Sequence, residues 1–390
     1  MPSIKSDVVT TADNTLQIGT GSRVKIQKQD RTWMLRALEL AAKGRGNTSP
    51  NPMVGAVVVN DGRVVGEGYH EAAGQAHAEV NAFREARGDA SGATLYVSLE
   101  PCSFQGRTPP CVAAVIEADV SRVVVAMVDP DPRVSGDGIR ALRDAGLLVE
   151  VGVLEDQARE LNAAYVHHRE TGRPLVSTKV AQTLDGRIAT STGHSQWITC
   201  ESARARVHSM RSLSDAVMVG IGTVLADDPR LTVRHTSGSQ PFRIVLDTTG
   251  RTPHHARILD PQQSQPALIY VSERADAKSR AAIESKNGMC VTVPEGGDGR
   301  LDVVSVLNDL GQRNVTDLMI EGGPCVITSF LQEREIHKYW CFVAPKLLGH
   351  GMASIGNIGI NSVDDALNLE DTRIENIGDD FLISGTIAYP

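Results

Sequence analysis

Aromatic side chains are scarce in this chain, and long apolar runs are missing from it. Phe, Trp and Tyr make up 4% of the 390 residues, which leaves little material for the stacking platforms that bind single-stranded nucleic acid. No run approaches the roughly eighteen apolar residues of a membrane helix, so we expect no membrane partner. Basic residues are also in deficit, with 39 Lys and Arg against 47 Asp and Glu. The net charge of −8 disfavours a nucleic-acid partner.

Cysteine is sparse as well, with six residues in the whole chain. The first thirty residues are polar and lack the apolar core of a secretory signal. We therefore interpret residues 1–30 as a polar N-terminal extension and expect a cytoplasmic protein. In that reducing compartment, cysteines serve as metal ligands or buried thiols more often than as disulfides.

Strand-like and helix-like patterns alternate along the first half, which predicts an α/β sheet covered by helices. The expected strands are 54–59, 63–69, 93–99, 122–128 and 147–153. The expected helices are 30–44, capped by Asp30, 77–86 and 138–146. Asn60-Asp61-Gly62 is a hairpin signal between the first two strands. A long helical pattern over 155–172 ends at Gly172, before Pro174, which places a domain boundary between residues 172 and 173.

The second half restarts the alternation and predicts a second α/β domain. Its expected strands are 175–181, 216–222, 242–247, 267–272, 317–323 and 338–345, and its expected helices include 201–212 and 300–313. The dinucleotide fingerprint G-x-G-x-x-G begins at Gly220 and Gly222 but fails because position 225 is Leu. Gly322-Gly323 precede a helical pattern whose first N–H groups suit a phosphate, although a tight strand-to-helix turn explains both glycines equally well.

Residues that favour zinc lie close together in the first half: His77, Cys102 and Cys111. A catalytic zinc uses three such protein ligands and leaves a fourth place for water. Glu79 adds a carboxylate that can move protons without binding metal. His-x-Glu followed by Pro-Cys-x₂-Cys is the signature of zinc deaminases. Here eight residues separate the cysteines, and the turn-prone stretch 106–110 allows both thiols to reach one ion.

Other interpretations of this region stay open. A single His or Cys is more often an ordinary polar or core residue, and it is the combination that favours a metal site. A structural zinc in a binding module would need a fourth protein ligand, for which the sequence offers only His70 nearby. Asn51, His70 and Asp129 lie at strand ends or loops, where ligands are commonly bound, but turns and caps use the same residue types.

Ten segments carry a family resemblance: NPMVGAVVV, GEGYH, HAEV, LEPCSFQGRTPPC, DPDP, KVAQTLDGRIA, SQWIT, TVLADDPRLTVR, EGG and VAPKLLG. In this order, over roughly residues 31–388, they resemble the RibD family of bacterial bifunctional riboflavin biosynthesis proteins. The resemblance implies a cytidine-deaminase-like three-layer domain at 31–172 and a dihydrofolate-reductase-like α/β domain at 173–390. It also implies two cofactors, Zn²⁺ and NADPH, and a small phosphorylated pyrimidine as substrate.

The same resemblance implies two successive reactions and a role for each matching residue. Hydrolytic deamination of 2,5-diamino-6-ribosylamino-4(3H)-pyrimidinone 5′-phosphate would precede NADPH-dependent reduction of its ribosyl group to ribityl. His77, Cys102 and Cys111 would bind zinc, with Glu79 as the catalytic proton shuttle. The NADPH side would comprise Gln182, Trp197, Thr223, Asp227 and the segment from Gly323. The substrate side would comprise Asn51, His70, Asp129, Lys179, Ser195, Arg211, Leu231, Arg234 and Glu321.

Two positions depart from the family pattern. The family usually has His after Pro-Cys-Ser, where this chain has Phe104, and Asn in Asp-Pro-Asn-Pro, where it has Asp131. The first change removes a hydrogen-bonding side chain, and the second replaces an amide donor by a negative charge. Neither position is a metal ligand, so we expect zinc binding to persist. The alternative function is an active reductase joined to a deaminase of altered specificity.

We also expect a homo-oligomer.

Overall fold

The computed structural model describes residues 28–104, 109–234 and 236–390. Most of the extension predicted at 1–30, and most of the predicted turn at 106–110, therefore lie outside the described residues. Contacts divide the chain into two compact units. One comprises Met1–Gly44 and Met53–Leu161, and the other Arg45–Pro52 and Asn162–Pro390. Among the described helices, none combines the length and the hydropathy that a bilayer crossing requires.

The first unit is built on one five-stranded sheet with the order β2-β1-β3-β4-β5. Its strands are β1 (Gly55–Asn60), β2 (Arg63–Tyr69), β3 (Thr94–Val97), β4 (Arg122–Val125) and β5 (Leu148–Val151). β1 runs antiparallel to both β2 and β3, whereas β3, β4 and β5 are parallel. The predicted hairpin turn is confirmed, because Asp61 and Gly62 both have positive φ, as a two-residue turn of this hand requires.

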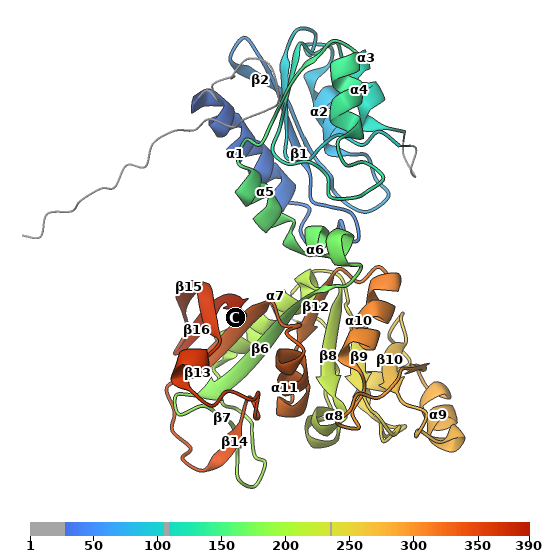
Figure 1. Ribbon diagram of the computed structural model, residues 1–390, viewed down its shortest axis with the longest axis vertical. Helices are drawn as coiled ribbons and strands as arrows, with labels where there is room; N and C mark the ends of the chain where they lie inside the picture. The colour runs from blue at the N-terminus through green and yellow to red at the C-terminus, as the bar shows by residue number, and fades with distance from the viewer. Residues whose placement is uncertain (1–27, 105–108, 235) are drawn as a thin grey trace, which may run out of the picture. The chain divides into compact units, whose positions relative to one another are not determined.

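Helices cover both faces of this sheet, which makes three layers (Figure 1). The helices are α1 (Lys28–Ala42), α2 (Ala78–Ala86), α3 (Cys111–Glu117), α4 (Asp137–Asp144) and α5 (Glu155–Leu161). Alanines of α2 and valines of α3 pack with Val58, Val97 and Val125 on one face. α1 packs on the other face together with α5, and Tyr96 of β3 donates a hydrogen bond to Asp30 there.

The second unit contains a nine-stranded sheet with the order β11-β10-β9-β8-β12-β6-β13-β16-β15. Its strands are β6 (Leu175–Thr183), β8 (Ala216–Gly220), β9 (Phe242–Leu246), β10 (Ala267–Val271), β11 (Gly288–Thr292), β12 (Asp317–Ile320), β13 (Lys338–Ala344), β15 (Asn368–Ile377) and β16 (Asp380–Ala388). The first seven strands of this order, from β11 to β13, are parallel to one another. β16 is antiparallel to β13, and β15 is antiparallel to β16. A separate ribbon pairs β7 (Arg187–Thr190) with β14 (Gly351–Ala353).

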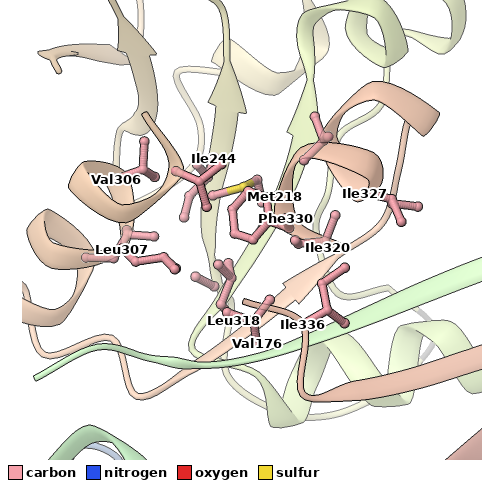
Figure 2. Packing of buried hydrophobic residues seen from close by; sticks show 14 of the residues in the cluster. Val176, Met218, Ile244, Val306, Leu307, Leu318, Ile320, Ile327, Phe330 and Ile336 are labelled. Atoms are coloured by element: carbon pink, nitrogen blue, oxygen red, sulfur yellow. The ribbon is translucent and has the colours of Figure 1, made fainter. Parts of the chain in front are cut away.

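Helices also cover both faces of the larger sheet. They are α6 (Ala163–Thr171), α7 (Glu201–Leu213), α8 (Ile221–Asp227), α9 (Ala277–Glu284), α10 (Val303–Gln312) and α11 (Pro324–Gln332). Figure 2 shows the core on one face, where Phe330 of α11 and Leu307 of α10 pack against Met218, Ile244 and Ile320 of the central strands. Residues of α8 and α9 join the core on the opposite face. The predicted pair of α/β domains is therefore observed.

Two predicted elements differ in detail, and one hairpin was not predicted. The first helix begins at Lys28 instead of being capped by Asp30, because the Asp30 carboxylate is bound by Tyr96 and by Arg122. The long helix predicted over 155–172 is broken into α5 and α6 at Asn162, whose φ of −101° and ψ of 22° are not helical. The hairpin of β15 and β16 had no clear signal in the sequence, because β15 is mostly exposed and polar.

Candidate active sites

Three soft ligands meet in the first unit. Nδ1 of His77 lies 3.0 Å from Sγ of Cys111 and 3.6 Å from Sγ of Cys102. All three ligand atoms lie within 4.8 Å of one another, and this is the only such group among the described His, Cys, Asp and Glu residues. Zinc bonds of ordinary length in a tetrahedron would separate nitrogen and sulfur ligands by about 3.6 Å. The three side chains therefore fit a zinc ion with a fourth position for water.

Local structure explains why these residues converge. His77 is the N-cap of α2 and Cys111 is the first residue of α3, while Cys102 follows β3 in a loop and accepts a hydrogen bond from the Cys111 N–H at 3.2 Å. The helix α2 can approach the sheet closely because Gly68 has no Cβ. A Cβ there would overlap the backbone of Ala78 and would lie 2.9 Å from the Cβ of Asn81.

The electrostatics of this cluster suit a bound cation. Hydrogen bonding from Cys111 is the main cause that lowers the pKa of Cys102, to about 4. The same bond and burial raise the pKa of Cys111, because two adjacent thiolates repel each other. Glu79 is 3% exposed, and burial raises its pKa to about 6. A cation between the sulfurs would favour both thiolates.

A buried carboxylate that the sequence analysis missed holds the loop of Cys102 in place. Glu100 accepts hydrogen bonds from the backbone N–H groups of Asp129, Gly136, Gly138 and Ile139, at 2.9–3.1 Å. A Cβ at Gly138 would overlap the carbonyl oxygen of Pro101, so α4 lies directly against this loop. The only sequence signal was a Glu directly before Pro-Cys.

The predicted substrate residues of the first domain lie in different surroundings. The ring of His70 is 2% exposed, lies 5.3 Å from the ring of His77, and faces the Ala76 carbonyl oxygen at 3.2 Å. Asp129 is buried at the end of the loop that Glu100 binds. Asn51 belongs to Arg45–Pro52, which groups with the second unit. The assigned roles of these residues stay predictions.

A buried charge cluster forms at the carboxyl ends of the central strands in the second unit. Glu321 follows β12 and accepts two hydrogen bonds from the guanidinium of Arg211 on α7. Nζ of Lys179 on β6 lies 4.0 Å from the Glu321 carboxylate. The two cations hold the pKa of Glu321 near 2, against the effect of its burial, while burial lowers the pKa of Lys179. Ligands commonly bind at this edge of a parallel sheet.

The substrate residues predicted beyond this cluster lie close to it. Arg211 also donates to the carbonyl oxygen of Thr232 at 3.1 Å, and Arg234 donates to the Thr232 hydroxyl at 2.9 Å. Leu231 is buried and has a φ of 52°, which is unusual for a residue with a Cβ. Arg211 and Arg234 thus both donate hydrogen bonds to Thr232.

Two of the residues predicted to bind NADPH lie side by side. Thr223 of α8 lies beside Gly323, and a Cβ added at Gly323 would come within 3.3 Å of the Thr223 hydroxyl. Gly323 is the N-cap of α11, whose first residue, Pro324, has no N–H. The N–H groups of Val326 and Ile327 donate to the Gly323 carbonyl oxygen at 3.1 and 3.2 Å. Ser195 donates to Asp227 at 3.5 Å. The Ser195 contact joins a residue predicted on the substrate side to one predicted on the NADPH side.

Two further NADPH residues contact other parts of the unit. Gln182 at the end of β6 accepts a hydrogen bond from Ser354 at 3.0 Å. Trp197 is 63% exposed and carries the guanidinium of Arg204 over its ring, 4.6 Å from the ring centre. Lys346 donates to the Trp197 carbonyl oxygen at 2.9 Å. An exposed indole held by cations offers a flat surface on which a ring of a cofactor could stack.

Comparison with known proteins identifies both halves. Residues 174–383 match the family of the RibD C-terminal domain, and residues 27–127 match the cytidine and deoxycytidylate deaminase zinc-binding region. A riboflavin biosynthesis protein RibD of Aquifex aeolicus is 44% identical over 359 residues, which are 92% of this chain and 98% of that protein. The chain belongs to the RibD family. A RibD structure from Acinetobacter baumannii has 38% identity and a TM-score of 0.83, and covers 93% of this chain and 99% of its own.

Membership of the RibD family accounts for both sites. A structure from Thermotoga maritima with 34% identity and a TM-score of 0.80, covering 92% of this chain and 99% of its own, is titled a diaminohydroxyphosphoribosylaminopyrimidine deaminase/5-amino-6-(5-phosphoribosylamino)uracil reductase. The chain is accordingly a bifunctional enzyme of riboflavin biosynthesis, with a deaminase and a reductase half. Its cofactors are zinc and NADPH.

Proposed function

We propose that the chain deaminates 2,5-diamino-6-ribosylamino-4(3H)-pyrimidinone 5′-phosphate and then reduces the ribosyl group of the product to ribityl. Residues 31–172 would carry the first activity and residues 173–390 the second. The observation that carries this proposal is the meeting of His77, Cys102 and Cys111 beside the buried Glu79. The product of both steps is 5-amino-6-ribitylamino-uracil 5′-phosphate.

In the deaminase half, His77, Cys102 and Cys111 would hold the zinc ion. Bound zinc supplies a Lewis acid that activates water at neutral pH. Glu79 would then take a proton from the attacking water and deliver it to the amino group, which leaves as ammonia while the ring carbon gains oxygen. The burial of Glu79 supports this role, because it excludes bulk water from the proton transfer.

In the reductase half, the charge cluster would bind the sugar phosphate. Arg211 and Arg234 would bind the phosphate through forked hydrogen bonds, and Glu321 would hold Arg211 in position. Lys179 would lie beside the ribose. NADPH supplies the hydride that reduces the sugar carbon. The cofactor would be oriented by Thr223, Gly323, Gln182, Asp227 and Trp197. The exposed indole of Trp197 supports this assignment.

Incubation of the purified full chain with the diamino-pyrimidinone phosphate tests the proposal directly. Without NADPH we expect release of ammonia and a product in which one amino group is replaced by oxygen. With NADPH we expect a second product that contains two more hydrogens, and a matching loss of NADPH absorbance. Mass spectrometry of both mixtures distinguishes these products, and an unchanged substrate in both would refute the proposal.

The same experiment distinguishes the alternative in which the deaminase half has altered specificity. In that case NADPH oxidation would depend on an added deaminase, because the reductase half would receive no substrate from its own chain. This alternative is tested because Phe104 and Asp131 depart from the family pattern.

We further propose that the enzyme is a homo-oligomer and acts in the cytoplasm. Its substrate and NADPH are both small phosphorylated metabolites of that compartment. Light scattering of the purified chain checks the first statement and cell fractionation the second.

A further inference from the structure

The two departures from the family pattern meet at a single side chain. The guanidinium of Arg133 lies over the ring of Phe104, 4.9 Å from its centre. The same guanidinium donates to both oxygens of Asp131, from Nε at 2.9 Å and 3.2 Å and from Nη2 at 2.6 Å. Asp131 also accepts the backbone N–H of Arg133 at 3.0 Å. A ring on one side and a carboxylate along one edge thus fix the orientation of Arg133.

This cluster is attached to the zinc-ligand loop at two points. Phe104 lies two residues after Cys102 in the chain. The Asp131 N–H donates to the Asp129 carboxylate at 2.9 Å, and the Asp129 N–H donates to Glu100 at 3.1 Å. Glu100 in turn lies two residues before Cys102. The cluster of Phe104, Asp131 and Arg133 is thus joined on both sides to the loop that carries Cys102.

Arg133 changes the charge balance that the substitution at position 131 alone would give. Asp131 is 4% exposed, and a buried carboxylate without a partner would repel a phosphorylated substrate. Its pairing with Arg133 balances that charge. The Arg133 side chain remains 61% exposed, so its guanidinium can reach a group in solvent. The donors lost at positions 104 and 131 are therefore replaced by one guanidinium.

We propose that Arg133 binds the phosphate of the pyrimidine substrate in the deaminase half, with Phe104 and Asp131 as its positioning residues. This inference rests on the proposed function. The phosphate is the strongest hydrogen-bond acceptor on such a substrate, and a guanidinium binds it with a matching planar fork. A guanidinium already fixed by a ring and a carboxylate loses less conformational freedom on binding. An isolated surface ion pair would contribute little, but the guanidinium of this pair also lies over the Phe104 ring.

Kinetics of the Arg133→Gln variant test the inference, with ammonia release measured on the phosphorylated substrate and on its dephosphorylated form. We expect the KM for the phosphorylated substrate to rise roughly 10- to 100-fold, as for the loss of a charged hydrogen bond. The KM for the dephosphorylated form should change less than about threefold. Zinc content and the reductase activity of the same chain should be unchanged, because neither depends on Arg133.

A matched control and a repaired variant complete the design. Arg140 is also an exposed arginine of this unit, paired with Asp137 three residues before it, and Arg140→Gln should leave both KM values unchanged. The triple variant F104H/D131N/R133Q restores the family pattern at positions 104 and 131 and should regain a low KM for the phosphorylated substrate.

Three results would overturn the inference: an unchanged KM in Arg133→Gln, an equal rise for both substrates, or loss of zinc from the variant. The first two results would show that Arg133 does not bind the phosphate, and the third would show that Arg133 has a structural role. If the unmodified chain releases no ammonia at all, the proposed function fails instead, so the two failures are distinguishable.

Discussion

Glu79 illustrates how position decides chemistry at the scale of single residues. It lies in the first turn of α2, two residues after His77, and is 3% exposed. A carboxylate on a helix surface would be an ordinary solvated group, whereas this one faces the cluster of His77 and the two cysteines. Burial is the main cause of its raised pKa, and a group of this kind exchanges protons readily near neutral pH.

Replacement of Glu79 by Gln should therefore separate chemistry from metal binding. We expect the variant to retain its zinc and to lose ammonia release by about 10²–10⁴-fold, the usual contribution of one acid–base group. The assay is ammonia release by the full chain, with metal analysis of the same sample. Ammonia release at the unmodified rate would remove Glu79 from the mechanism.

At the scale of elements, close approach of α2 to β2 sets the position of two site residues. Gly66 and Gly68 of β2 face the backbone of α2, and a Cβ at either would overlap it. The helix carries Glu79 and begins directly after His77. Gly66 and Gly68 thus allow close packing of the helix that follows His77, where larger side chains would ordinarily occupy a strand.

The Gly68→Ala substitution tests this packing. We expect a loss of about 1–3 kcal/mol in stability, because the added methyl group forces α2 away from the sheet, and a weaker hold on zinc. Chelator competition measures zinc affinity, and thermal unfolding measures stability. Gly297→Ala is the control, since a Cβ at Gly297 meets nothing within 4 Å. Equal zinc affinity in both variants would contradict the role of this contact.

A second prediction at this scale concerns β12. Burial and the nearby Asp215 raise the pKa of Asp317, the first residue of that strand, from 3.8 to about 7. Between about pH 4 and pH 7, Asp317 is therefore protonated in the folded unit and ionised in the unfolded chain. The free energy of unfolding consequently falls as the pH rises through this window. Asp317→Asn should flatten this dependence, which we expect to amount to about 1–3 kcal/mol.

Urea unfolding at pH 5 and pH 8, followed by tryptophan fluorescence, measures this dependence. Trp197 and Trp340 lie in the same unit and report on its unfolding. An identical change of stability with pH in the original chain and in Asp317→Asn would show that another group carries the effect.

At the scale of the whole molecule, the deaminase and reductase halves belong to one chain but have separate hydrophobic cores. Each unit has its own sheet and its own buried clusters. Among the described residues, the group that could hold zinc comes from the first unit alone. The charge cluster of Glu321 and Arg211 lies wholly within the second unit. The two activities should therefore respond separately to loss of a cofactor.

Removal of zinc with a chelator provides the test. We expect ammonia release to stop and to return when zinc is added, while NADPH oxidation with the deaminated substrate continues at more than about half of its rate. The control is the untreated chain measured in the same two assays. A parallel loss of both activities would show that zinc also stabilises the reductase unit.

The sequence by itself determined most of the element types and singled out the three residues that could hold zinc. Alternating apolar patterns predicted β1 to β5 and the central strands of the second unit, because buried strands and amphipathic helices differ in their period. His77, Cys102 and Cys111 were predictable since so few residue types bind zinc and since cysteine is rare here. The exposed strand β15 and the break at Asn162 were not predicted, because neither leaves a periodic pattern.

Only the tertiary structure decided how distant residues act on one another. The pairing of Glu321 with Arg211 joins residues 110 positions apart, and Glu100 binds backbone groups as far as 39 residues away, so no local pattern contains either contact. Phe104 and Asp131 read singly as losses of hydrogen-bonding capacity, and the structure joins them through Arg133. The physical reason is that side-chain chemistry belongs to the residue, whereas charge balance and burial belong to its surroundings in space.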